Sequence, residues 1–154
     1  MTTKLGRALL LVTASAVGQT VAGRTPRPCT PIEYRRTQDV ASRPRTWDAL
    51  YRVYKRYGRC EDTDASEGLS ESVARILVDH WSTLPRLAEL SVDRAFIRFV
   101  LGHINASLDT KDVHRIGDMA VKSCPAGLDR LCADIEKQVH AAEAEDTSYR
   151  KPKE

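Results

Sequence analysis

Four cysteines carry the most tightly constrained chemistry in this chain. Cys29, Cys60, Cys124 and Cys132 are an even set, which predicts two disulfides in an oxidising compartment. Of the three connectivities, we prefer Cys124–Cys132 together with Cys29–Cys60. Positions eight residues apart in one helix would be separated by about 12 Å, whereas bridged Cα atoms lie within roughly 7 Å. The first pair therefore requires a chain reversal, for which Pro125-Ala126-Gly127 is suitable turn chemistry.

The histidines are the second chemical candidate. His103 and His114 would meet across a helical hairpin, where Asp112 or Asp118 could complete a metal or hydrolytic site. The sequence contains no Gly-x-Ser-x-Gly, His-Glu-x-x-His, Cys-x-x-Cys or phosphate-binding glycine loop. We therefore expect surface or packing histidines and predict no catalytic residue, metal or cofactor. A His/carboxylate enzyme is the less favoured alternative.

Acidic residues are concentrated within eleven positions: Glu61, Asp62, Asp64, Glu67 and Glu71. A calcium-binding EF-hand is rejected, because Glu67 stands where the loop needs glycine and Val73 where it needs glutamate. One interpretation is a solvated loop before a helix that starts at Ser70, with the carboxylates favouring its N-terminus. The other is a negative recognition face for a basic partner. We predict that Asp62, Asp64 and Glu67 belong to such a contact face.

Composition predicts one small globular domain without a nucleic-acid partner. The 154 residues are 42% hydrophobic and 29% charged, which is ordinary for a folded domain. The chain has 24 Lys and Arg against 21 Asp and Glu. Such near-neutrality lacks the basic footprint of a nucleic-acid binder. We interpret the Lys and Arg residues as spread along the helices, where they favour solubility.

Residues 1–22 have the three-part pattern of a secretory signal peptide. Lys4 and Arg7 precede an apolar run over residues 8–12, and small residues follow as far as Ala22. The apolar run is much shorter than the roughly 20 residues of a membrane span. We therefore expect a soluble periplasmic protein that does not insert into the membrane. In an exported chain, Asn105-Ala106-Ser107 also fits a glycosylation sequon, a tripeptide that is common by chance.

The remaining chain shows helical periodicity and no convincing alternating strand pattern. Residues 23–45, with four prolines, are expected to be irregular; residues 46–143 to form the helical domain; and residues 144–154 to be a flexible tail. The prediction is an all-α fold, a compact bundle of five or six short helices with disulfides. The expected helices begin at Thr46, Ser70, near Leu84, at Asp93, at Asp109 or Thr110, and beyond Gly127.

Apolar, aromatic and cysteine residues recur at characteristic spacings over residues 46–140: Trp47, Leu50-Tyr51, Tyr54, Cys60-Glu61-Asp62, Ser70 to Val73, Leu77, Trp81, Phe96 to Ile104, Ile116, Ala120, Cys124-Pro125, Leu131-Cys132 and Ile135. This arrangement resembles the Rap/Tai group of type VI secretion immunity proteins.

The resemblance implies a small, all-helical, disulfide-bearing periplasmic protein. Characterised proteins of that group bind and inhibit a cell-wall amidase effector. It therefore implies a secreted effector as partner and inhibition by occlusion of the active site of that enzyme. A scaffold protein of unknown partner, or one that self-associates into a homodimer, is the alternative from a different functional class.

Overall fold

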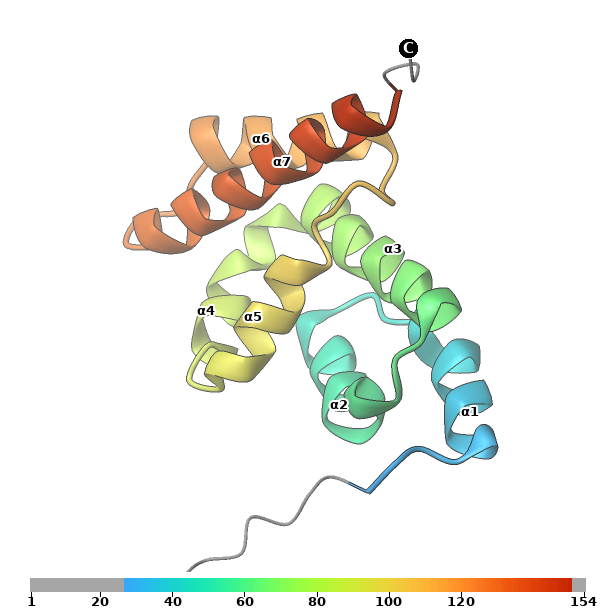
Figure 1. Ribbon diagram of the computed structural model, residues 1–154. Helices are drawn as coiled ribbons and strands as arrows, with labels where there is room; N and C mark the ends of the chain where they lie inside the picture. The colour runs from blue at the N-terminus through green and yellow to red at the C-terminus, as the bar shows by residue number, and fades with distance from the viewer. Residues whose placement is uncertain (1–26, 151–154) are drawn as a thin grey trace, which may run out of the picture.

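The computed structural model describes residues 27–150, and this part of the chain consists of helices and connecting turns (Figure 1). The predicted all-α class is confirmed, with seven α-helices in the described residues instead of five or six. They are α1 (Pro31–Ala41), α2 (Trp47–Tyr57), α3 (Thr63–Asp79), α4 (Leu84–Leu90), α5 (Arg94–Gly102), α6 (Thr110–Lys122) and α7 (Asp129–Arg150). The predicted signal peptide at 1–22 lies outside the described residues.

Helix α1 corrects the prediction that residues 23–45 are irregular. The Thr30 hydroxyl accepts a hydrogen bond from the Glu33 N–H (3.2 Å), and the Glu33 carboxylate accepts one from the Thr30 N–H (2.9 Å). This reciprocal capping box starts a helix, and Pro31 in its first turn has a φ angle already suited to it. Thr37 and Ala41 are buried, so the helical domain includes α1 and does not begin at residue 46.

Helix α3 corrects the prediction that the acidic segment is a loop. The Asp62 side chain accepts a hydrogen bond from the Ala65 N–H (3.0 Å) and caps the helix, which begins at Thr63 and not at Ser70. An N-cap carboxylate and the acidic residue Asp64 in the first turn both favour a helix start at this point. Asp64 and Glu67 therefore lie on the first two turns of a regular helix and Glu71 on the third, while Asp62 caps the helix and Glu61 precedes the cap.

The other predicted helix ends agree with the structure. Thr46, Asp93 and Asp109 are the N-caps of α2, α5 and α6, and Gly58 follows the last residue of α2. Helix α7 runs from Asp129 to Arg150, so the described part of the predicted tail, residues 144–150, is helical. No helix of the described part combines the length and apolar character that a membrane span requires.

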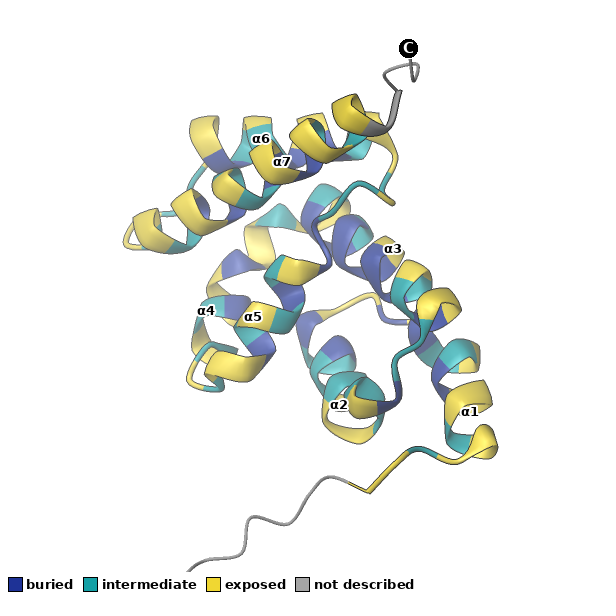
Figure 2. Cartoon of the chain, in the orientation of Figure 1, coloured by how far each residue is buried: buried dark blue, intermediate teal, exposed yellow. Residues whose placement is uncertain are grey.

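Helix α3 lies in the middle of the molecule, with α1 and α2 on one side and the α6–α7 pair on the other (Figure 1). Helices α1 and α3 approach closely at Gly68, where a Cβ atom would lie 2.9 Å from Ala41 Cβ. The buried Ser72 hydroxyl donates to the Ala41 carbonyl oxygen (2.8 Å). Buried faces point toward this centre (Figure 2). Its largest fully buried side chains are Trp47, Phe96, Leu50, Leu69, Ile76, Leu77, Leu84, Leu87, Ile104, Ile116, Ile135 and Val73.

Both preferred disulfides are present. Cys29–Cys60 and Cys124–Cys132 have Cα–Cα distances of 5.6 and 6.1 Å. The second closes over the predicted chain reversal, where Gly127 has a φ of 78°, a left-handed conformation that favours glycine. The two bridges therefore fix the N-terminal end of α1 and the turn between α6 and α7.

Candidate partner-binding site

The acidic segment forms one wall of an open hollow of about 450 Å³. The first turns of α3 supply this wall, and the segment after α5 supplies the opposite one. We call this feature the acidic hollow; it is lined by Glu61, Asp62, Thr63, Ser66, Glu67, Asn105 and Ser107. Three of its seven lining residues are acidic and none is basic, so it presents a negative concave surface.

The three predicted contact residues differ in their surroundings. Asp62 lines the acidic hollow but is engaged twice, as the cap of α3 and as acceptor of a hydrogen bond from Gln38 Nε2 (2.9 Å). Asp64 lies outside the lining and accepts a longer bond from the same Gln38 nitrogen (3.3 Å). Glu67 is exposed, lines the hollow, and has no hydrogen bond or ion pair with another described residue. Glu67 is therefore the carboxylate of the three that is free to meet a partner.

A buried polar network supports both walls of the acidic hollow. Asn105 Nδ2 donates to Ser70 Oγ (3.2 Å), and Ser70 Oγ lies 3.1 Å from His103 Nδ1. Since the Ser70 oxygen accepts from Asn105, its own proton is free to be donated to His103 Nδ1. The other ring nitrogen then carries the hydrogen that faces Glu61 Oε2, at 3.6 Å. These four residues connect α3, the end of α5 and the turn before α3 into one unit.

Electrostatics keep the inner end of the acidic hollow negative. The interaction with the His103 ring lowers the pKa of Glu61, and a hydrogen bond from Ser66 adds to this effect, while partial burial opposes it. At 3.6 Å the contact between His103 Nε2 and Glu61 Oε2 is longer than a hydrogen bond, and with a neutral ring it is a polar contact and not an ion pair. Glu61 is therefore ionised at neutral pH and adds its charge to that of Asp62 and Glu67.

The histidines do not meet in the way the enzyme alternative requires. His103 is buried beside Ser70, whereas His114 is exposed and lies 3.5 Å from Glu143 of α7. Among the described residues, one group of three potential metal ligands has atoms within 4.8 Å of one another: Cys29, Glu33 and Cys60. Its two sulfur atoms are bonded to each other in the disulfide.

The structure does bring a serine, a histidine and a carboxylate into line, which the sequence spacing did not reveal. Ser70 contacts Nδ1 of His103 and Glu61 faces Nε2, the reverse of the usual order in serine hydrolases. Ser70 is only 1% exposed, so a substrate cannot reach its hydroxyl in this conformation. The arrangement acts as a buried structural link in this conformation.

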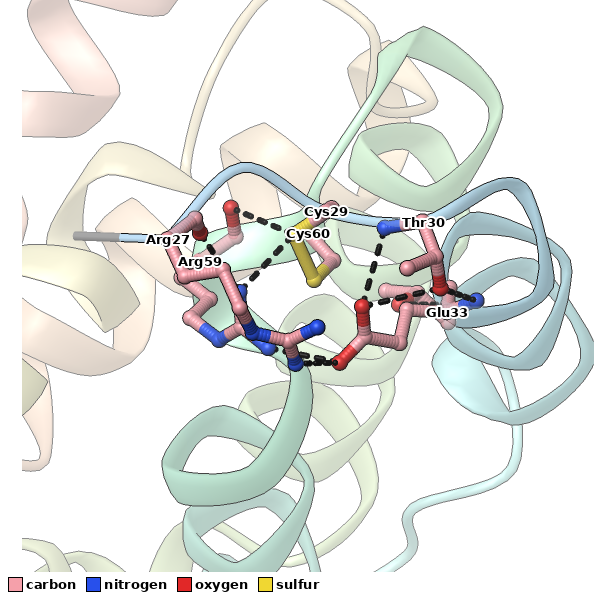
Figure 3. The surroundings of a disulfide bond; sticks show 7 residues. Arg27, Cys29, Thr30, Glu33, Arg59 and Cys60 are labelled. Atoms are coloured by element: carbon pink, nitrogen blue, oxygen red, sulfur yellow. Dashed lines mark hydrogen bonds and ion pairs between the residues drawn. A yellow bond between two sulfur atoms is a disulfide. The ribbon is translucent and has the colours of Figure 1, made fainter.

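The Cys29–Cys60 disulfide anchors the chain just before the acidic hollow (Figure 3). Glu33 lies beside it and forms ion pairs with Arg27 (2.8 Å) and Arg59 (2.6 Å). Hydrogen bonds from the Thr30 backbone and hydroxyl, with the two nearby guanidinium groups, lower the pKa of Glu33 to about 2. The start of α1 is thus tied covalently and electrostatically to the segment that leads into α3.

Asn105 and Ser107 are site residues that the sequence interpretation did not assign. The Asn105 Oδ1 accepts hydrogen bonds from the Ser107 N–H (3.0 Å) and hydroxyl (2.7 Å), which forms a local turn. Its Nδ2, the atom that glycosylation would modify, donates to Ser70 and to the Gly102 carbonyl (3.1 Å). The Asn105 amide therefore stabilises one wall of the acidic hollow through these hydrogen bonds. The Asn-x-Ser sequence could have been interpreted as a turn signal.

Fold and site together define a disulfide-stapled, all-helical domain with an acidic hollow whose walls are held by buried hydrogen bonds. Comparison with known protein families, with curated proteins and with solved structures gave no match to this chain.

Proposed function

We propose that this chain is an exported, non-enzymatic binding protein that inhibits a secreted cell-wall amidase by covering its active site. The observation that carries the proposal is the acidic hollow, an open negative cavity with one free carboxylate at Glu67. The resemblance of residues 46–140 to the Rap/Tai immunity proteins supports the class of partner. The two disulfides are in keeping with an oxidising compartment such as the periplasm.

The partner should offer a projecting basic segment to the acidic hollow. Arg or Lys side chains that enter it would pair with Glu67 and lie near Glu61 and Asp62. Opposite charge on the two surfaces would also accelerate their encounter. Binding of this kind places the body of α3 and α5 over the neighbouring surface of the enzyme, and substrate is excluded without any chemistry.

Preorganisation supports inhibition by a rigid surface. The walls of the acidic hollow are joined by Ser70, His103 and Asn105, and the Cys29–Cys60 bridge fixes the chain before it. A surface that is already ordered loses less conformational entropy when it binds. The inhibitor therefore needs no segment that folds on contact.

The test compares two charge reversals on the oxidised, exported protein. Glu67→Lys places a cation in the acidic hollow, whereas Glu145→Lys makes the same change at an exposed site on α7. Each variant is titrated calorimetrically against the amidase that the native chain captures from an envelope extract. We expect Glu67→Lys to weaken binding at least tenfold and Glu145→Lys to change it less than twofold. Equal affinities for the two variants would refute the acidic hollow as the contact face.

A further inference from the structure

A second surface feature lies between α1 and α2. It is a shallow groove of about 410 Å³ with an apolar floor that includes Val40, Val53 and Tyr57. Arginines at positions 43, 52 and 56 line it as well, and none of its lining residues is acidic. We call this feature the arginine groove.

The arginine groove belongs to the most basic part of the chain, which corrects the interpretation that cationic residues are evenly spread. Residues 27–59 contain nine Lys and Arg but three acidic residues. Within this segment Glu33 pairs with Arg27 and Arg59, so these three charges largely offset one another. Asp48 pairs with Arg86 of α4, and Lys55 pairs with Asp93. The net charge of the whole chain is close to zero, but the α1–α2 segment carries a net positive charge.

The three arginines of the groove have no carboxylate at ion-pair distance, although Arg52 interacts over a longer distance with Asp48 and helps to lower the pKa of that carboxyl. Among the described residues, none of Arg43, Arg52 and Arg56 forms an ion pair within 4 Å, and the Arg56 guanidinium lies 5.4 Å from the centre of the Tyr57 ring. Such cations beside apolar floor residues match a ligand that combines carboxylates with an apolar side chain.

The arginine groove and the acidic hollow face opposite sides of α1. Gln38 contacts Asp62 and Asp64 beside the hollow, whereas Val40 lines the groove. Side chains two residues apart on an α-helix, such as those of Gln38 and Val40, point about 200° apart around the helix axis. A ligand in the groove would therefore leave the acidic hollow open, so the two surfaces can act independently.

We propose that the arginine groove binds an acidic segment of a partner protein, with an apolar side chain of that segment on the floor and carboxylates on Arg43, Arg52 and Arg56. An amphipathic helix laid between two helices is a common mode of peptide recognition. A flat anionic bilayer fits less well, because Val53 and Tyr57 are half-buried in a hollow and do not project.

The first test uses a fluorescein-labelled twelve-residue peptide of Glu and Leu arranged as an amphipathic helix. A second peptide has Gln in place of every Glu, and binding to the full oxidised chain is followed by fluorescence anisotropy. We expect the acidic peptide to bind at least tenfold more tightly than the Gln peptide, and the preference to shrink as salt is raised. Absence of binding, or equal binding of the two peptides, would overturn the proposal.

The second test locates the binding. The double variant Arg52→Gln/Arg56→Gln changes the groove, and Arg115→Gln/Lys137→Gln makes the same charge change on exposed positions of α6 and α7. We expect a loss of at least tenfold in peptide affinity for the first variant and less than twofold for the second. Equal losses would show that general positive charge attracts the peptide, which contradicts a built site.

A third measurement separates a protein segment from a lipid surface. Vesicles of phosphatidylethanolamine and phosphatidylglycerol (3:1) are sedimented with the native chain and with the groove variant. We expect no cosedimentation that depends on Arg52 and Arg56. Groove-dependent binding to these vesicles, without displacement by the acidic peptide, would assign the groove to membrane lipid and overturn the proposal.

Discussion

Gln38 of α1 donates a hydrogen bond to Asp62, the residue that caps α3, over 2.9 Å. The same carboxylate therefore starts one helix and holds another against it. An acidic side chain that looks available for a partner in the sequence is thus part of the framework. In the acidic segment, Asp62 therefore contributes to stability, whereas Glu67 is the residue available for binding.

The first prediction concerns that separation. Asp62→Ala removes the N-cap of α3 and the contact with Gln38, so it should lower the free energy of unfolding by about 1 kcal/mol, the usual cost of losing a cap. Glu67→Ala should change it by less than about 0.5 kcal/mol, because Glu67 is exposed. Urea unfolding followed by circular dichroism measures both. A larger loss for Glu67→Ala would contradict the assignment.

The second prediction tests the buried network. Ser70→Ala leaves His103 Nδ1 without its partner in a buried site, which should cost about 1–3 kcal/mol in unfolding free energy. Ser82→Ala, at an exposed position, is the control and should stay within about 0.5 kcal/mol of the native value. If both variants unfold at the same urea concentration as the native chain, the network does not hold the site together.

The third prediction ranks the two disulfides. Cys29 and Cys60 are 31 residues apart, and Cys124 and Cys132 are 8 apart. Loop-closure entropy predicts losses of about 4 and about 2.5 kcal/mol when each pair is replaced by alanine. Denaturant unfolding of the two double variants measures the difference. The reverse order would show that native-state packing, and not the unfolded chain, dominates the effect of these bridges.

The fourth prediction is a pH dependence that arises at Glu33. Its pKa falls from an ordinary 4.5 to about 2 in the folded chain, so its ionised form stabilises the fold fully above pH 4.5. That stabilisation is lost as pH falls from 4.5 toward 2, because in this window the unfolded chain takes up a proton at Glu33 while the folded chain still holds the carboxylate ionised. The native unfolding free energy should fall more steeply over this window than that of Glu33→Gln. Parallel curves would contradict the assignment, and added salt should reduce the difference.

Three helix starts with a single capping residue were predictable from the sequence. Thr46, Asp93 and Asp109 each precede an apolar stripe, and their caps are those of the structure. The preferred disulfide pairing is the one found, although the sequence did not choose among three connectivities; for Cys124–Cys132, the residues around Gly127 offered the chain reversal that the bridge requires. These features depend on local geometry.

The two missed helical segments had local signals that composition obscured. Thr30 and Glu33 form a capping box inside a proline-rich segment, and Asp62 is an N-cap inside an acidic run. The concentration of arginine in residues 27–59 was likewise readable, but was hidden by a near-zero total. Prolines and charged residues that suggested irregular chain therefore belong to helix starts at Thr30 and Asp62 and to a basic surface on α1 and α2.

The site itself depends on contacts between distant residues. Ser70 and His103 are separated by 33 positions, and Ser70 and Asn105 by 35. Nothing in the spacing of these residues specifies that they meet, because their contact follows from how α3 packs against the end of α5. The acidic face was therefore predictable in outline, whereas its walls and its free carboxylate required the fold.

The most direct test of the central claim is the rate at which the captured amidase cleaves purified peptidoglycan as this chain is added. Our account predicts that the native chain stops cleavage at one molecule per enzyme, that Glu67→Lys needs at least tenfold more protein, and that Glu145→Lys acts like the native chain. Cleavage that continues unchanged at saturating native protein, or peptidoglycan turnover by the chain alone, would contradict it.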